Sequence, residues 1–206
     1  MRLQIENCKL PIASVCVLFV AMSGVTAMVG HAQRDLVTPI AYQDLLNGLK
    51  DPTRWPVYSG DYTGQRHSPL TQITPDNARQ LGAQWTFQTE TMARGRGFEA
   101  TPLALDGVLY VTGPNDFAWA LDGKTGRPFW RYRRDLPNNL TYGASVPVNR
   151  GFAVLGNRLF MTTLDAHLVA LDMRNGGVLW DVEIADYKIG HSATVSPLAV
   201  KDKIIV

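Results

Sequence analysis

Three polar side chains occupy corresponding places along the chain and could together bind a ligand. Glu99 lies three residues before Pro102, and Thr194 lies three residues before Pro197. Arg150 lies two residues before the equivalent position of the unit between them. A guanidinium can grip a carboxylate through two parallel hydrogen bonds, and a hydroxyl can add another. Each residue taken alone is more often solvated surface, but their shared register favours a pocket for an anionic, planar ligand with polar edges.

Other chemistries have weaker support in the sequence. No metal-ligand spacing is visible, and His67, His167 and His191 are isolated from one another, so structural or surface roles are predicted for them. Ser145 has no obvious base partner, which argues against a nucleophile. The residues themselves therefore give no support for a metal site or a nucleophile.

The elements that would position the three polar residues repeat every fifty residues. The repeated features are an Ala-Leu-Asp triplet, a turn glycine and a tryptophan, found at 120–122 and 170–172, Gly126 and Gly176, and Trp130 and Trp180. Trp85 lies seventeen residues before Pro102, as Trp180 lies before Pro197, so Trp85 closes a preceding unit. Because the tryptophans recur strictly beside a glycine-containing turn, we predict that they pack one unit on the next and are not platforms for a ligand.

Each repeat has the pattern of four short strands. In the first repeat we expect them at 102–105, 108–112, 117–121 and 127–132, with Asp106-Gly107 forming a tight hairpin turn. Four short strands per unit, without alternating helices, predict an all-β fold, a β-propeller with four-stranded blades and tryptophan docking motifs. A third copy starts at Pro197 and stops at Val206. We expect an incomplete propeller, about the first two to three blades of an eight-bladed ring, in the N-terminal part of a longer protein.

The N-terminus resembles an export signal. Arg2 and Lys9 precede an uncharged, largely apolar run at 10–29, and small residues precede a cleavage point before Gln33. An uncleaved membrane anchor is the alternative. We divide the chain into a signal peptide at 1–32, a lead-in segment at 33–54 and a partial propeller at 55–206. Both cysteines lie in the first segment, so the mature chain would have no disulfide and no thiol nucleophile.

Composition excludes two classes of protein. The chain is 46% hydrophobic and 18% charged, which is incompatible with long-range disorder. Its net charge is +2, and no basic cluster is interleaved with aromatic residues, so a nucleic-acid partner is not expected.

From about Trp55 to its end, the chain resembles the N-terminal part of the pyrroloquinoline quinone (PQQ)-dependent alcohol dehydrogenases, the methanol dehydrogenase-like quinoproteins. The tryptophan motif at 120–130 is similar to the motif that closes their blades, although Asn175 replaces the usual threonine in the second copy. Three more specific segments, 99–102, 148–151 and 194–197, match segments that contact the quinone. The resemblance implies that Glu99 hydrogen-bonds the cofactor's edge, Arg150 its carboxylate or quinone oxygens, and Thr194 another carboxylate.

One departure concerns the redox tuning of the cofactor. Many members have a vicinal cysteine pair where this sequence has Ala144-Ser145. Small residues can still pack on a flat ring, so cofactor binding is expected to survive.

In the family, a Ca²⁺-like ion and a carboxylate base complete the reaction. The resemblance places the metal-binding carboxylate and the catalytic aspartate beyond Val206. We therefore expect residues 1–206 alone to be inactive.

The resemblance implies a periplasmic dehydrogenase that oxidises alcohols to aldehydes, with PQQ and Ca²⁺ as cofactors. Its electrons would pass to cytochrome c or to a membrane quinone such as ubiquinone. Two alternatives stay open: a non-catalytic propeller scaffold for outer-membrane protein assembly, and a PQQ-dependent sugar dehydrogenase. The tryptophan motif alone does not separate these functions, because non-enzymatic propellers also contain it.

Overall fold

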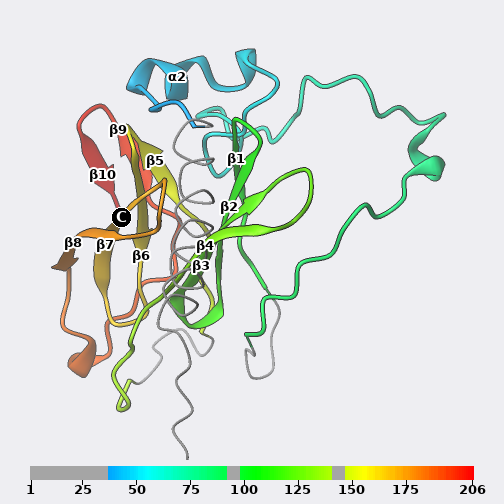
Figure 1. The fold of residues 1–206 in the computed structure, drawn as a ribbon. Helices are drawn as coiled ribbons and strands as arrows, with labels where there is room; N and C mark the ends of the chain where they lie inside the picture. The colour runs from blue at the N-terminus through cyan, green and yellow to red at the C-terminus, as the bar shows by residue number, and fades with distance from the viewer. Residues whose placement is uncertain (1–36, 92–97, 141–146) are drawn as a thin grey trace, which may run out of the picture.

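A computed structural model describes residues 37–91, 98–140 and 147–206. The predicted signal peptide and the Ala144-Ser145 pair lie outside the described residues, as does Ser145 as a candidate nucleophile. Two four-stranded antiparallel sheets and a two-stranded hairpin follow one another along the chain (Figure 1). Their strands are β1 (Leu103–Leu105), β2 (Val108–Gly113), β3 (Phe117–Asp122), β4 (Pro128–Arg133), β5 (Ala153–Leu155), β6 (Arg158–Thr162), β7 (His167–Asp172), β8 (Val178–Glu183), β9 (Leu198–Val200) and β10 (Lys203–Ile205).

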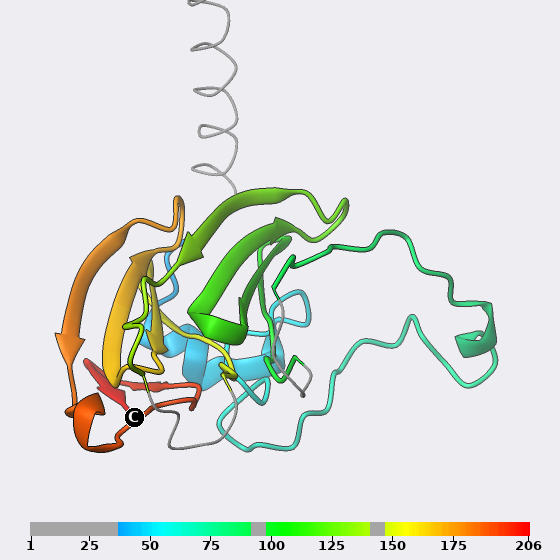
Figure 2. The same ribbon diagram turned by 90° about the horizontal axis from the view of Figure 1, so that it is seen from below.

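The strands in each sheet pair in chain order, which confirms the predicted four-stranded blades. The two sheets also share one register. Ala120 pairs with Trp130 and Ala170 with Trp180, and each pair is followed by a bulge. The fifty-residue repeat is therefore a repeat of hydrogen-bond pattern as well as of sequence. Figure 2 shows the two twisted sheets side by side, as successive blades of a propeller would lie.

The tryptophans join successive units as predicted. The Trp85 indole N–H donates to the Gly123 carbonyl at 3.2 Å, and Trp130 donates to the Met173 carbonyl at 3.0 Å. Gly176 has a φ of +72°, and a Cβ there would lie 2.7 Å from the Trp130 ring. Glycine is thus required at this position for two reasons: the backbone is left-handed, and the indole approaches too closely for a side chain.

The first hairpin forms the predicted turn, since Asp106 and Gly107 both have positive φ, at 49° and 82°. Gly156 takes the corresponding place in the second blade with a φ of 61°. The Gly156 backbone also pairs with Ile40, so this turn joins the second blade to the N-terminal segment as well.

Residues 37–62 run across the innermost strands. Trp55 pairs with Ala104 in β1, Ile40 pairs with Gly156 beside β5, and the Tyr62 hydroxyl donates to the Ala199 carbonyl in β9. The segment therefore contacts all three units. It contains α2 (Tyr42–Asn47), and the short 3₁₀ helices of the chain are η1 (Gly48–Lys50), η2 (Ala78–Gln80), η3 (Pro114–Asp116) and η4 (Tyr187–Ile189).

The apolar core lies within and between the sheets and extends to residues 37–62. Its fully buried side chains include Leu103, Tyr110, Leu159 and Met161, together with Ile40 from the N-terminal segment. Residues beyond 62 leave the sheets as a long exposed excursion that returns at Trp85 (Figure 1). Within the described part of the chain, no helix has the length and apolarity needed to span a membrane.

Candidate functional site

The three predicted site residues lie at the entrances to successive blades. Glu99 precedes β1, Arg150 precedes β5 and Thr194 precedes β9. Backbone hydrogen bonds tie these entry segments together. The Thr101 amide donates to the Arg150 carbonyl, and the Arg150 amide donates to the Thr194 carbonyl, each at 3.1 Å. Residues at corresponding positions of the repeat therefore lie next to one another in the structure.

The side chains form one cluster centred on Arg150. Its guanidinium donates to the Glu99 carboxylate at 2.9 Å and to the Thr194 hydroxyl. The side chains of Arg150 and Glu99 are 40% and 35% exposed, so the pair faces solvent and contributes little to folding. The sequence prediction that these residues converge is confirmed, and their role in binding a cofactor stays a prediction.

A cavity of about 330 Å³ adjoins Arg150, whereas Glu99 and Thr194 are not among the residues that line it. Arg150 lines one side, Ser196 and Pro197 continue from the third unit, and Tyr58 and Asp61 come from the N-terminal segment. This wall from the N-terminal segment was not predicted, because no local pattern indicates that the segment folds back over the inner strands. The lining is mainly apolar, with the Arg150 guanidinium and the Asp61 carboxylate among its few charged groups, so the cavity can accept a molecule of moderate size with an apolar body and polar edges.

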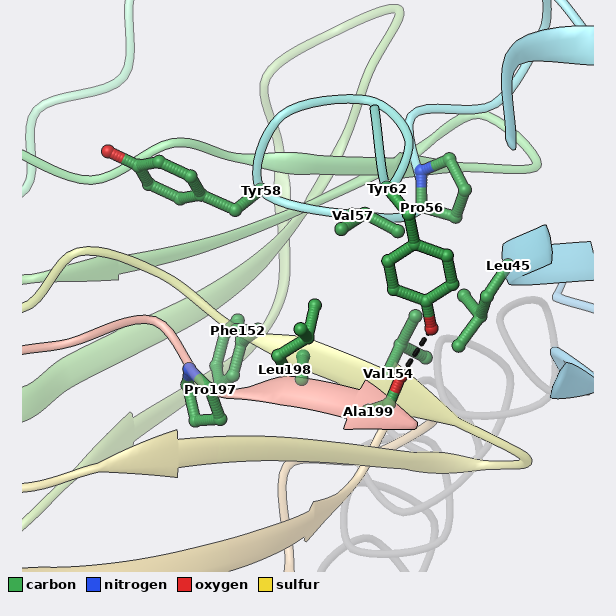
Figure 3. A pocket seen from close by; sticks show the side chains of 11 residues that line it. Leu45, Pro56, Val57, Tyr58, Tyr62, Phe152, Val154, Pro197, Leu198 and Ala199 are labelled. Atoms are coloured by element: carbon green, nitrogen blue, oxygen red, sulfur yellow. Dashed lines mark hydrogen bonds between the residues drawn. The ribbon is translucent and has the colours of Figure 1, made fainter. Parts of the chain in front are cut away.

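A second, smaller pocket lies beside the cavity (Figure 3). Its volume is only about 10 Å³, so it holds no more than a water molecule. Figure 3 shows Tyr62 reaching toward Ala199, with Leu45 and Val154 close to its ring. This pocket is a packing seam between the N-terminal segment and β9, and the larger cavity is the better candidate for a ligand.

Tyr58 brings a second polar group to the edge of the cavity. Its ring lies beneath the Arg66 guanidinium, with 4.7 Å between the guanidinium carbon and the ring centroid. Hydrogen bonding to Arg66 lowers the pKa of the Tyr58 hydroxyl, against the opposing effect of burial. Arg66 and Arg150 both favour the ionised form of this hydroxyl, and the Asp61 carboxylate, which also lines the cavity, opposes them in attracting an anion.

A buried polar network lies directly behind Arg150. Asp116 is fully buried, and its carboxylate accepts hydrogen bonds from the Asn149 side chain at 3.0 Å and from the Leu164 amide at 2.7 Å. Burial raises the pKa of Asp116 to about 7. Asp116 was not among the predicted site residues, since an aspartate in a hairpin loop is ordinarily a solvated turn residue.

The histidines agree with the structural or surface roles predicted for them. His67 and His191 are exposed. His167 contacts Asp181 at 2.7 Å, and Asp181 also accepts from Arg134, whose guanidinium binds Asp165. This charged group links β4 to the second sheet. Among the described residues, no group of three or more His, Cys, Asp or Glu side chains is arranged to hold a metal ion.

Comparison with known proteins identifies relatives of the chain. Residues 55–181 match the family described as the β-propeller domain of PQQ-containing glucose/ethanol/alcohol dehydrogenase. The 1-butanol dehydrogenase (cytochrome c) of Thauera butanivorans is 39% identical over 74% of this chain and 22% of its own length. The quinoprotein alcohol dehydrogenase PedH of Pseudomonas putida is 36% identical over 81% of this chain and 28% of its own length.

Solved structures give the same result. The quinohemoprotein alcohol dehydrogenase ADHIIG of Pseudomonas putida superposes with a TM-score of 0.73 at 34% identity, covering 82% of this chain and 25% of that one. A europium-containing methanol dehydrogenase also gives 0.73 at 34% identity, covering 79% and 28%. The predicted propeller and the predicted family are confirmed, and the chain spans about a quarter of the length of these relatives.

Proposed function

The chain belongs to the β-propeller family of PQQ-dependent glucose/ethanol/alcohol dehydrogenases, and on this basis we propose that it supplies part of the cofactor pocket of an alcohol dehydrogenase. The observation that carries the proposal is that Arg150 lines the cavity of about 330 Å³ and is hydrogen-bonded there to Glu99 and Thr194. Relatives named as 1-butanol dehydrogenases and as a quinoprotein alcohol dehydrogenase favour an alcohol as the substrate.

The residues present fit PQQ in size and in chemistry. The cavity falls within the range of about 300–1,000 Å³ that is usual for small-molecule sites. PQQ is planar and bears carboxylates, and the cavity is bordered by the Arg150 guanidinium and the Ser196 and Tyr58 side chains. When bound, the quinone supplies the acceptor for the hydride of the alcohol.

Each protein residue then has a defined task. The Arg150 guanidinium binds and orients a carboxylate or a quinone oxygen of the cofactor, because it offers several N–H donors in one plane. The Thr194 hydroxyl, which already accepts from Arg150, can donate its own proton to another cofactor oxygen. Glu99 fixes the guanidinium from the opposite side and accepts a hydrogen bond from the edge of the ring system.

The remaining parts of the reaction belong to the rest of the proposed enzyme. We place the catalytic carboxylate and the metal ligands beyond Val206, with Ca²⁺ as the metal, although one structural relative is named as containing europium. The acceptor is proposed to be cytochrome c or a membrane quinone, in line with the two 1-butanol dehydrogenases, named for cytochrome c and for quinone. A periplasmic location is proposed from the N-terminal pattern and would give a mature protein starting at Gln33.

Reconstitution of the full-length protein tests the proposal. The apoprotein should gain dye-linked oxidation of primary alcohols when PQQ and Ca²⁺ are added together, and glucose should be a poor substrate. Oxidation of glucose in preference to alcohols would favour the sugar dehydrogenase. Absence of PQQ binding would favour the non-catalytic scaffold, and mass spectrometry of the mature N-terminus would test export independently.

A further inference from the structure

A fully buried carboxylate is linked to the residue next to Arg150. Asp116 ends the short η3 helix between β2 and β3, and its side chain accepts from the Asn149 amide at 3.0 Å. The other carboxylate oxygen accepts from the backbone N–H of Leu164, in the turn between β6 and β7. The carboxylate therefore joins the two blades at the end where Arg150 enters.

Both polar atoms of the Asn149 side chain are hydrogen-bonded. Its Nδ2 donates to the Thr162 carbonyl at 2.8 Å as well as to Asp116, and its Oδ1 accepts from the Gly151 amide at 3.2 Å. Its own carbonyl accepts from the buried Thr112 hydroxyl at 3.4 Å. Asn149 is only 1% exposed and is bonded to Gly151, so hydrogen bonds hold the backbone on both sides of Arg150.

The loop that contains Asp116 is held in a costly conformation. Asn115 and Asp116 both have left-handed backbones, with φ of 56° and 54°, although neither is glycine. The Asn115 amide donates to the Pro147 carbonyl at 2.9 Å, which attaches the loop to the strand entry of the next blade. Strained residues of this kind persist where surrounding contacts require them, and they gather at functional sites.

We propose that Asp116 is a positioning residue that acts through Asn149 to hold Arg150 in the orientation that binds the cofactor. The inference rests on the proposed function, since it assumes that Arg150 contacts PQQ. Asp116 itself does not reach the ligand, because it is completely buried behind Asn149. A carboxylate with a purely structural role would affect folding without acting through Arg150, so the two roles can be separated.

The test is a double-mutant cycle on the affinity of the full-length apoprotein for PQQ, measured by calorimetry with Ca²⁺ present. We expect Asp116→Asn and Asn149→Ser each to weaken binding by about tenfold, as loss of a supporting partner commonly does. Arg150→Gln should weaken it by at least as much. In the Arg150→Gln background, Asp116→Asn and Asn149→Ser should cause no further loss, because the residue through which they act is already gone.

Asp172→Asn is the matched control, since it removes a buried carboxylate from the last residue of β7, at the opposite end of the blade. It should leave PQQ affinity unchanged. Full additivity of Asp116→Asn with Arg150→Gln would overturn the inference, and so would wild-type affinity in both single variants. If Asp116→Asn does not fold, Asn149→Ser and its double variant decide by the same criterion. If Arg150→Gln alone binds PQQ normally, the proposed function fails first, and the inference fails with it.

Discussion

At the scale of single residues, the site depends on one guanidinium that serves two neighbours. Arg150 contacts Glu99 and Thr194, which come from segments 51 and 44 residues away in sequence. A guanidinium has five N–H donors in one plane, so it can make both contacts and still present an edge to a ligand. Since the Glu99–Arg150 pair is partly exposed, its value to stability is small. Its importance should therefore show in binding.

Glu99→Gln tests this separation between stability and binding. The change removes a partly screened charge pair, so the free energy of unfolding should change by less than about 1 kcal/mol. PQQ affinity should fall several-fold, because the guanidinium loses the carboxylate that orients it. Urea unfolding and PQQ titration of the same full-length variant provide the two measurements. A large loss of stability at unchanged affinity would contradict the expected role of Glu99.

The buried Asp116 predicts a specific pH dependence of stability. Its pKa is about 7 in the folded protein, and about 3.9 is usual in an unfolded chain. A raised pKa means that the carboxyl group's contribution is complete below about pH 4 and is lost as the pH rises through 7. The wild type should therefore lose stability relative to Asp116→Asn over this interval, by up to about 1.4 kcal/mol per pH unit.

The measurement is the difference in unfolding free energy between the wild type and Asp116→Asn from pH 4 to pH 8. The groups facing Asp116 include Asp165 and Arg134, so Asp165→Asn is the control. Burial disfavours the Asp165 carboxylate, but hydrogen bonds from Arg134 and Thr163 prevail and lower its pKa. The contribution of the Asp165 carboxylate to stability is therefore lost as the pH falls, whereas that of Asp116 is lost as the pH rises. A difference that does not vary with pH would show that Asp116 does not titrate in this range.

At the scale of elements, the tryptophan and the glycine turn of the next blade form one unit of packing. Trp130 is 8% exposed because it lies against Gly176 and donates to Met173. The sequence offset that places tryptophan four residues after a turn glycine in each blade places it against the glycine of the following blade in space. Blade order is thereby encoded by a repeated local pattern.

A pair of glycine substitutions tests this packing. Gly156→Ala introduces a left-handed alanine with no atom within 4 Å of the new Cβ, and should cost about 1–2 kcal/mol. Gly176→Ala adds a contact of 2.7 Å to the Trp130 ring and should cost about 1–3 kcal/mol more. Chemical unfolding of both full-length variants measures the difference. Equal losses would mean that the indole moves aside and that the close approach is not required.

How far the sequence predicts the structure depends on whether the signal is local. Strands, turns and tryptophan docking follow from periodic residues such as Trp130 and Gly176, and their prediction is confirmed. The convergence of Glu99, Arg150 and Thr194 was predictable because equivalent positions of successive propeller blades lie close together in space. The roles of Tyr58 and Asp116 were not, because they depend on a segment folding across three inner strands and on one buried loop, and neither leaves a repeated pattern in the sequence.

At the scale of the whole molecule, the N-terminal segment and the blades form one continuous structure. Residues 37–62 contact β1 through Trp55, the turn after β5 through Ile40 and β9 through Tyr62, so they connect the inner parts of three units. The same segment provides Tyr58 and Asp61 to the cavity beside Arg150. Contacts that hold the inner strands together and contacts that shape the cavity thus come from the same stretch of chain.

The last prediction concerns the third tryptophan of the series, Trp180. Trp130 is buried by the turn of the second blade, whereas Trp180 is less buried and the neighbouring Val182 is 52% exposed. Because both sheets share one register, the full-length protein should cover Trp180 with the turn of the third blade, as Trp130 is covered here. Trp180→Ala in the full-length protein should then cost about 3–5 kcal/mol, as expected for a buried tryptophan and as Trp130→Ala should. Thermal unfolding of the two variants compares them. A loss near zero for Trp180→Ala, beside a large loss for Trp130→Ala, would mean that the blade repeat does not continue in the way that the first two units predict.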